Sequence, residues 1–399
     1  MLELFAGIGA CSKALSNIGI EHEIVDAVEI DSYAVKSFNA IHGTNFVPQD
    51  ITKWDKDVKV DLIMHGSPCQ DFSMAGKQAG GDAGSGTRSS LMYETLRIVE
   101  KLRPKYVVWE NVRNLLGPKH RHNFGAYLTK MRELGYVSAF RVLNAKDFGI
   151  PQSRERVFTV SVLIPEHAND FSNDLHSLGV FDFPEPFPLE KRLKDVLDDE
   201  VEDRFYLTPE RLKKIKVWEE RQIENGRGFR FNALSKDDVA KTVTTTADRP
   251  AGANYVMEPM IVDPQGRVNK VHTLRDTCPT LRAQTHGNPP CVMQVAQMYG
   301  FSKEPNPQAG RVYDERGLSP TLDTMSGGNR MPKVLDAYSD GTRVRKLTPL
   351  ECWRLMGFDD EDYKKAASTG NSETQLYKQA GNSICVNVLE EIFKKLFKA

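Results

Sequence analysis

One cysteine stands in a sequence context that favours a nucleophile. Cys69 lies in the run GSPCQDFS, directly after an apolar stretch that predicts a buried strand. Pro68 restricts the backbone before it, and the polar, glycine-rich residues that follow make a poor core segment and a good lid. Most free cysteines are inert and buried, so position is what distinguishes this one. The end of a strand is where open α/β sheets bind ligands, which favours a reactive thiol here.

A carboxylate and two guanidinium groups are expected near this thiol. Glu110, in the run ENV, ends the next predicted strand and reaches the same sheet edge. In QSRERV, Arg154 and Arg156 are two residues apart and share one face if a strand begins there. Such a pair suits an anionic or carbonyl-rich ligand, although a solvated pair is the ordinary alternative. A cysteine-histidine hydrolase would need an imidazole partner, and His65 lies inside its own predicted strand, where a structural role is expected.

A glycine-rich turn after the first predicted strand indicates a nucleotide-type cofactor. In FAGIGA, Gly7 and Gly9 let backbone N–H groups approach a ligand at a helix N-terminus. Ser12 stands at the third glycine of the dinucleotide fingerprint, so a plain tight turn is the alternative. Glu29 and Asp50 end the next two β-like segments, where a carboxylate can accept from ribose hydroxyls. No arginine follows the second strand, so a nucleoside cofactor fits better than a pyrophosphate.

Alternating strands and helices must position these residues. Strands are predicted over residues 1–5, 24–29, 60–66, 106–110, 137–143 and 156–163. Helical spacing of apolar residues predicts helices over 89–101 and 129–134. This rhythm is typical of a Rossmann-like α/β sheet with helices on both faces. We expect it to form a catalytic and cofactor-binding domain over residues 1–163.

The rhythm stops at residue 164. Residues 164–342 hold proline-rich links and scattered glycines, which predict a smaller, irregular β-rich domain. Within it, a Thr followed by Val or Leu, then a glycine and a closing Val, recurs at Thr242, Thr280 and Thr321. Three similar hairpins are the simpler interpretation of this repeat, and a dedicated binding device is the other.

Helical signals return in the last part of the chain. Thr348 can cap a helix with Pro349 in its first turn, and a final helix is predicted over 383–397. Residues 343–399 are therefore expected to return to the first domain.

Composition sets limits on the class of protein. The 399 residues are enough for two or three domains. Lys and Arg number 53 against 54 Asp and Glu, a net charge of −1, which neither indicates nor forbids a nucleic-acid partner. The 6 cysteines form no C-x-x-C pair, so we expect no disulfide framework, no metal site and a reducing cytoplasmic location. No run of about 18 apolar residues predicts a membrane span.

Taken together and in order, these motifs resemble the cytosine-C5 DNA methyltransferases of bacterial or phage restriction-modification systems. The resemblance covers almost the whole chain, through ELFAGIGA (3–10), VEID (28–31), Asp50-Ile51, GSPCQDFS (66–73), ENV (110–112), QSRERV (152–157), RKLTPLECWRLMGF (345–358) and QAGNS (379–383). GSPCQDFS, ENV and Q-x-R-x-R in this order are highly specific. Ala10 and Ile30 depart from the family, which often has a glycine and an aromatic residue there.

The resemblance implies transfer of a methyl group from S-adenosylmethionine to ring carbon 5 of a cytosine flipped out of a specific duplex DNA sequence. It implies that Cys69 adds to ring carbon 6 and that Glu110 binds ring nitrogen 3 and the exocyclic amine. Arg156 would hold the base carbonyl, and Arg154 would support the same pocket. In the implied cofactor site, Phe5 packs on the adenine, and Asp50 and Ile51 contact its edge. Glu29 binds the ribose, and Asn382 lies near the methionine part. The residues implied around these contacts are Ala6, Gly7, Ile8, Gly9, Ile30, Pro68, Leu91 and Ser383.

The resemblance also implies partners and leaves alternatives. The expected partner is double-stranded DNA, whose sequence residues 164–342 would recognise. The enzyme is expected to be a monomer, and a cognate restriction endonuclease would act separately. One alternative is an RNA (tRNA) cytosine-5 methyltransferase of the same family, whose Cys-Phe-Thr tripeptide is absent here. A binding protein that lost catalysis and an NAD oxidoreductase are further alternatives, disfavoured by the intact motifs.

Overall fold

The structure is a computed structural model of the 399-residue chain. It describes residues 1–68, 91–168, 174–224, 231, 233–245, 253–262, 268–270, 294–297, 311–313, 333–334 and 342–398. The chain divides into two compact units. Unit 1 comprises Met1–Val201, Asp237–Asn254 and Leu347–Ala399, and unit 2 comprises Glu202–Lys236 and Tyr255–Lys346.

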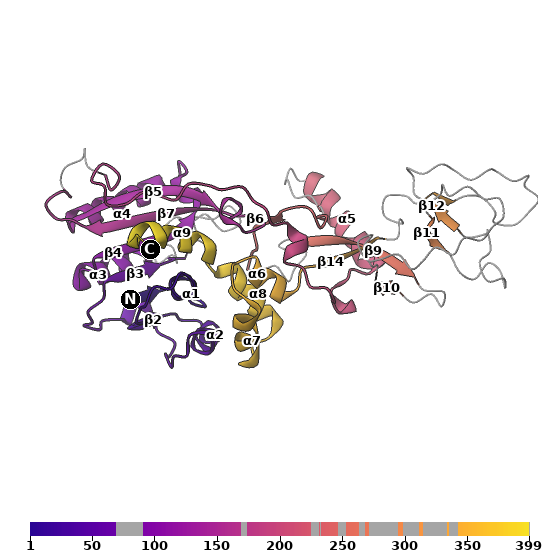
Figure 1. Ribbon diagram of the computed structural model, residues 1–399, viewed down its shortest axis with the longest axis horizontal. Coiled ribbons are helices and arrows are strands. Elements are labelled where there is room, and N and C mark those ends of the chain that lie inside the picture. The colour runs from indigo at the N-terminus through magenta and orange to yellow at the C-terminus, as the bar shows by residue number, and fades with distance from the viewer. Residues whose placement is uncertain are drawn as a thin grey trace, which may run out of the picture. The chain divides into compact units, whose positions relative to one another are not determined.

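A six-stranded sheet forms the centre of unit 1, in the order β2-β1-β3-β4-β7-β5 (Figure 1). Its strands are β1 (Leu2–Leu4), β2 (Asp26–Val28), β3 (Leu62–His65), β4 (Tyr106–Val112), β5 (Tyr136–Asn144) and β7 (Glu155–Leu163). The first four are parallel, and β7 runs antiparallel to both β4 and β5. All six coincide with predicted strands to within a few residues, and the predicted Rossmann-like α/β class is confirmed.

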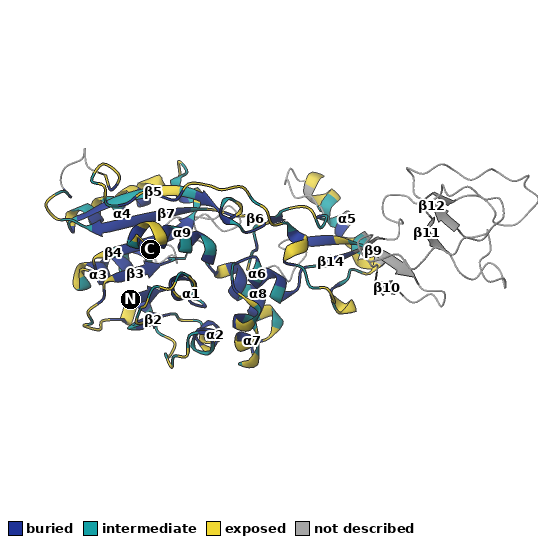
Figure 2. Cartoon of the chain, viewed as in Figure 1, coloured by how far each residue is buried: buried dark blue, intermediate teal, exposed yellow. Residues whose placement is uncertain are grey.

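Successive side chains along each strand point to opposite faces of the sheet, and different helices pack on the two faces. On one face Leu2, Ile63 and Trp109 join a buried cluster with residues of α3 (Met92–Leu102) and α4 (Arg121–Glu133). Glu3 points away from that cluster, toward α1 (Ala10–Asn17), which packs on α9 (Val386–Phe397). Figure 2 shows β3, β4 and β7 mostly in dark blue, as buried strands, whereas the middle of β5 is exposed.

The last part of the chain completes unit 1. It contains α6 (Pro349–Arg354), α7 (Asp360–Ser368), α8 (Glu373–Asn382) and α9, and α7 packs on α2 (Ser32–His42). The predicted cap of α6 is confirmed, because Thr348 and Glu351 form a reciprocal capping box and Pro349 opens the helix. The final helix begins later than predicted, at Val386, since residue 383 terminates α8.

Unit 1 also takes in residues that the sequence assigned to the second domain. The expected boundary lay at residue 163, but residues 164–201 remain with unit 1 because their polar groups bind its C-terminal part. Asp198 accepts from Arg354 and Thr348, and its N–H donates to Glu351 at 2.8 Å. Residues 237–254 return to unit 1 as well, where β6 (Gln152–Ser153) pairs in parallel with β8 (Ala240–Lys241).

Unit 2 contains a helix that the sequence analysis did not predict, α5 (Pro209–Glu224). Leu212, Ile215 and Trp218 provide a narrow apolar stripe at helical spacing, obscured in the sequence by the charged residues around it. The strands of this unit are β9 (Tyr255–Val262), β10 (Val268–Lys270), β11 (Gln294–Gln297), β12 (Arg311–Tyr313), β13 (Lys333–Val334) and β14 (Thr342–Lys346). Buried Arg345 of β14 pairs with Glu258 of β9 at 3.1 Å, and Tyr206 donates to the same carboxylate.

In the described residues of the first Thr-containing repeat, the strands do not pair with each other as the expected hairpin would require. Its strand β8 pairs with β6, whereas β9 pairs with β10 and β14. The repeats at Thr280 and Thr321 lie outside the described residues. Within the described ranges, no helix has the length and apolar character needed to cross a membrane.

Candidate active site

The glycine turn is shaped by residues with positive φ angles. Phe5, Gly7 and Gly9 have φ of 55°, 55° and 82°, which turns the chain sharply between β1 and α1. A Cβ at Gly9 would lie 2.1 Å from Nε2 of His42, so only glycine fits there. A Cβ at Gly7 would meet nothing within 4 Å, so its backbone borders open space, as a ligand-binding turn requires.

Glu29 is held against this turn. Its Oε2 accepts from the Gly7 N–H at 3.0 Å, and its Oε1 accepts from the Asp31 N–H at 2.8 Å. Burial raises the pKa of Glu29, and the two backbone hydrogen bonds oppose that shift. The turn and the end of β2 are therefore locked together through one carboxylate.

A cavity opens at the carboxyl ends of β1, β3 and β4. Its lining includes Phe5, Ala6 and Gly7 of the glycine turn and Glu110 of β4. Asn382 and Ser383 of QAGNS complete it from the opposite side.

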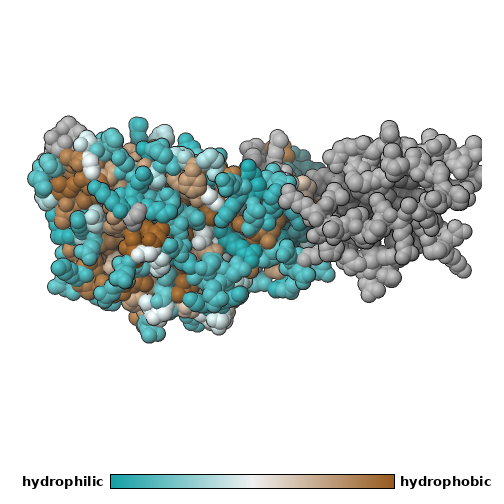
Figure 3. All heavy atoms as spheres, viewed as in Figure 1, coloured by the Kyte–Doolittle hydropathy of each residue, from teal (hydrophilic) through white to brown (hydrophobic). Residues whose placement is uncertain are grey.

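Other predicted cofactor residues lie outside this lining. Asp50 caps the short 3-10 helix Ile51–Lys53, and its hydrogen bonds from Thr52 lower its pKa. Ile51 is buried in the core, and Leu91 packs against that core. Ile30 is 70% exposed, an apolar side chain next to Glu29 that an aromatic ligand could cover. Figure 3 shows the described surface on one side as a mixture of hydrophilic and apolar residues.

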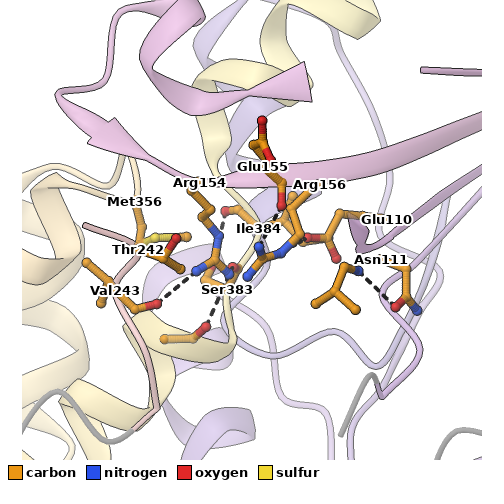
Figure 4. A network of polar contacts seen from close by, with 12 residues as sticks. Glu110, Asn111, Arg154, Glu155, Arg156, Thr242, Val243, Met356, Ser383 and Ile384 are labelled. Carbon is orange, nitrogen blue, oxygen red and sulfur yellow. Dashed lines mark hydrogen bonds and ion pairs between the residues drawn. The ribbon is translucent and has the colours of Figure 1, made fainter. Parts of the chain in front are cut away.

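Glu110 and Arg156 form an ion pair at the sheet edge. Their Oε1 and Nε atoms are 3.0 Å apart, and their side chains are 11% and 18% exposed. Glu110 comes from β4 and Arg156 from the neighbouring antiparallel strand β7 (Figure 4). Burial raises the pKa of Glu110, while Arg156 and then Arg154 lower it. Burial is the largest of these influences, so the pKa of Glu110 stays above its ordinary value.

Cys69 and the glycine-rich residues after it, which the sequence predicts to be a lid, lie outside the described residues. The structure does describe the chain as far as Pro68, and Ser67 is firmly anchored there. Trp109 Nε1 donates to Ser67 Oγ at 3.0 Å, and Asn111 Nδ2 donates to the Ser67 carbonyl at 3.2 Å. Because Trp109 and Asn111 flank Glu110, these bonds connect the approach to Cys69 with the strand that carries the carboxylate.

His65 is buried under this edge. Its Nε2 lies 3.1 Å from the Tyr127 hydroxyl, and its ring stacks on Trp109. Burial lowers the pKa of His65 to about 3, so the ring is neutral. The expected structural role within β3 agrees with this environment.

Arg154 and Arg156 have different environments. The Arg154 guanidinium is buried and donates to three carbonyls, those of Val243 at 2.9 Å, Gly381 at 3.2 Å and Ser383 at 2.8 Å (Figure 4). Neither arginine is among the residues that line the cavity. Gln152, Gly381 and Ser67 were not predicted as site residues, although they lie in the motifs QSRERV, QAGNS and GSPCQDFS. In the described ranges no group of three or more His, Cys, Asp or Glu residues could hold a metal ion.

The fold and this edge define a Rossmann-like α/β enzyme in which a cavity under the glycine turn lies beside a carboxylate-guanidinium pair. A family model described as "C-5 cytosine-specific DNA methylase" matches residues 1–398. The chain therefore belongs to the C-5 cytosine-specific DNA methylase family. Its activity is that of a DNA (cytosine-5-)-methyltransferase, as the resemblance had predicted.

Individual relatives agree with this assignment. The orphan methyltransferase M.SPRI of Bacillus phage SPR is 34% identical, with 99% of this chain and 97% of the relative covered. The type II methyltransferase M.HhaI of Haemophilus parahaemolyticus is 30% identical, covering 98% and 92%. The crystal structure of S. pombe Dnmt2 methyltransferase has the same fold, with a TM-score of 0.58, 19% identity and coverage of 100% and 97%.

Proposed function

We propose that the chain transfers a methyl group from S-adenosylmethionine to a flipped cytosine in a specific duplex DNA sequence, with Cys69 as nucleophile. The observation that carries this proposal is the buried Glu110–Arg156 pair beside the cavity under the glycine turn. A pairing carboxyl and a guanidinium match the amine, ring nitrogen and carbonyl along one edge of cytosine.

The residues around the cavity fit S-adenosylmethionine. Gly7 presents backbone to open space, Phe5 offers a ring for an adenine, and Glu29 lies at the turn with carboxylate lone pairs for ribose hydroxyls. Asn382 and Ser383 would meet the methionine part. When bound, S-adenosylmethionine supplies an electrophilic methyl group. Ile8, Gly9, Ala6, Pro68 and Leu91 would support this cofactor site from the turn and the adjoining loops.

The steps proposed for the chain's own residues require no metal ion. The Cys69 thiolate adds to ring carbon 6, and the electron pair of the 5,6 double bond makes ring carbon 5 nucleophilic. Glu110 hydrogen-bonds ring nitrogen 3 and the exocyclic amine, where charge develops, while Arg156 orients Glu110 and reaches the base carbonyl. After carbon 5 accepts the methyl group, which leaves S-adenosylhomocysteine, a water molecule takes the proton of carbon 5, and departure of the Cys69 thiolate from carbon 6 restores the 5,6 double bond.

We assign target choice to the inserted part of the chain, within residues 164–342. The motifs of unit 1 account for the cofactor and the base but leave nothing to contact flanking base pairs. The stretch 204–230 is basic, and the Thr-containing repeats offer side chains for groove edges. The enzyme would act as a monomer on DNA in a bacterial cytoplasm, with any restriction endonuclease a separate protein.

A methyl-transfer assay tests this proposal. Tritiated methyl groups should appear in duplex DNA and not in tRNA, and bisulfite sequencing of plasmid DNA after expression should reveal one protected sequence. Duplex carrying 5-fluorocytosine in that sequence should trap a covalent adduct on Cys69, since fluorine blocks the final elimination. Label in tRNA alone, or an adduct on another cysteine, would overturn the assignment.

A further inference from the structure

Residues 240–245 are held in unit 1 although both neighbouring stretches belong to unit 2. The chain leaves unit 2 after Lys236 and returns to it at Tyr255. Between these points lies the first Thr-containing repeat, KTVTT at 241–245. The segment held in unit 1 is therefore joined to unit 2 through the chain on both of its sides.

One side of the docked segment is fixed by QSRERV. Beyond the β6–β8 pairing, the Val243 N–H donates to Gln152 Oε1 at 2.9 Å, and Thr242 Oγ1 donates to the Ser153 carbonyl at 2.7 Å. Gln152 is fully buried, and its Nε2 donates to the Leu355 carbonyl at 2.6 Å. One amide side chain thus joins the segment to the end of α6.

The other side is fixed by QAGNS. Arg154 donates to Val243 of the segment and to Gly381 and Ser383 of QAGNS. The two backbones also touch, because a Cβ built on Gly381 would lie 2.3 Å from the Thr244 carbonyl carbon and the Thr245 nitrogen. The lack of a side chain at residue 381 is what allows this approach.

Asn382 and Ser383, the next residues after this contact, line the cavity assigned to the cofactor. We propose that Gln152 and Arg154 are positioning residues that join residues 240–245 to the QAGNS turn, so that DNA affinity and cofactor affinity depend on each other. The inference rests on the proposed function, since it takes the cavity as the cofactor site and the insertion as the DNA reader. By linkage, DNA must then raise cofactor affinity by the same factor as cofactor raises DNA affinity.

The test measures this factor with S-adenosylhomocysteine, which binds without reacting, and a short unmethylated duplex of the sequence found by bisulfite analysis. Calorimetry gives the Kd for S-adenosylhomocysteine with and without duplex. In the unmodified enzyme we expect a ratio in the range of about 5- to 150-fold. Gln152→Met keeps the length of the side chain but removes both hydrogen bonds, and Gly381→Ala forces the two backbones apart. Both should bring the ratio close to one.

Matched variants separate coupling from folding. Gly125→Ala is the control for Gly381→Ala, because Gly125 also lies within a helix but its Cβ would meet nothing within 4 Å. It should keep the ratio of the unmodified enzyme. Gln152→Glu keeps the acceptor for the Val243 N–H and should give an intermediate ratio; it also replaces Gln152→Met if that variant fails to fold by circular dichroism.

The outcomes distinguish this inference from the function it rests on. Folded variants that retain the full ratio, or an unmodified enzyme with a ratio of one, would overturn the positioning role and leave methyl transfer untouched. An unmodified enzyme that binds no S-adenosylhomocysteine would instead overturn the cofactor assignment itself.

Discussion

Glu3 gives the enzyme a stability that depends on pH, and Glu3→Gln should remove that dependence. The carboxylate is buried under the glycine turn, where Oε1 accepts from the Ser12 N–H at 3.1 Å and from the Ser12 hydroxyl. Burial raises the pKa of Glu3 from 4.5 to about 7, although these hydrogen bonds oppose the shift. The folded protein therefore holds a proton that the unfolded chain releases between these two values.

The sign follows from linkage. Stability falls with pH wherever the folded state binds more protons than the unfolded state, here from about pH 4.5 to about pH 7. A pKa raised from 4.5 to about 7 corresponds to a full difference of about 3.5 kcal/mol in the free energy of unfolding. Gln keeps an oxygen to accept from Ser12 and carries no charge, so Glu3→Gln should lack this loss.

Urea unfolding at about pH 4.5 and about pH 8 measures the effect. The free energy of unfolding of the unmodified enzyme should fall by about 3 kcal/mol more than that of Glu3→Gln across this interval. Glu21→Gln, at an exposed carboxylate, is the control and should follow the unmodified enzyme. Parallel pH profiles for Glu3→Gln and the unmodified enzyme would refute the reasoning, because they would mean that Glu3 titrates alike in both states.

Three further predictions concern the reaction. Cys69→Ser should abolish methyl transfer with the fold intact, because a hydroxyl forms far less nucleophilic anion at neutral pH; a tritium assay at the rate of the unmodified enzyme would contradict the nucleophile. Glu29→Ala should weaken S-adenosylmethionine binding by about 10- to 150-fold, because it removes one charge-assisted hydrogen bond worth about 1.5–3 kcal/mol. Asp50→Ala should weaken binding as well, and an unchanged Kd for both variants in calorimetry would exclude these contacts. Ser67→Ala leaves the buried Trp109 N–H without its Ser67 acceptor, so kcat should fall about 5- to 150-fold while the Kd for the cofactor stays unchanged. If kcat and the cofactor Kd change by equal factors, the role of Ser67 is merely structural.

Much of unit 1 could be predicted because strand positions and motif positions coincide in it. Each of the first four predicted strands ends where a motif begins, so the parallel order brings FAGIGA, Glu29 and Glu110 to one edge without further information. The cap at Thr348 could also be predicted, since Pro349 follows it in the first turn of the helix, whereas the part of Glu351 in the capping box was found only in the structure. These features depend on residues near one another in the sequence.

The parts that could not be predicted depend on contacts between distant segments. Asp198 binds α6 through Arg354, and this contact keeps residues 164–201 in unit 1 although the βαβ rhythm has ended. The approach of Gly381 to Thr244 joins residues more than a hundred positions apart, and a glycine in QAGNS carries no sign of its partner. Helix α5 was missed for a different reason, because its charged residues conceal an apolar stripe only one side chain wide.

The two arginines of QSRERV show why spacing alone does not assign roles. At i and i+2 they were expected to share one face of a strand, but the ladder of β7 begins at Glu155, between them. Arg156 lies within β7 beside β4 and meets Glu110, whereas Arg154 precedes β7 at the break after β6, where three backbone carbonyls surround its guanidinium. A buried guanidinium that lost these acceptors would remain desolvated, so substitution of Arg154 should disturb QAGNS and residues 240–245 together. Substitution of Arg156 leaves Glu110 without its nearest cation, and its pKa should then rise further. The same residue type, two positions apart, thus acts on the architecture of the site in one case and on its protonation in the other.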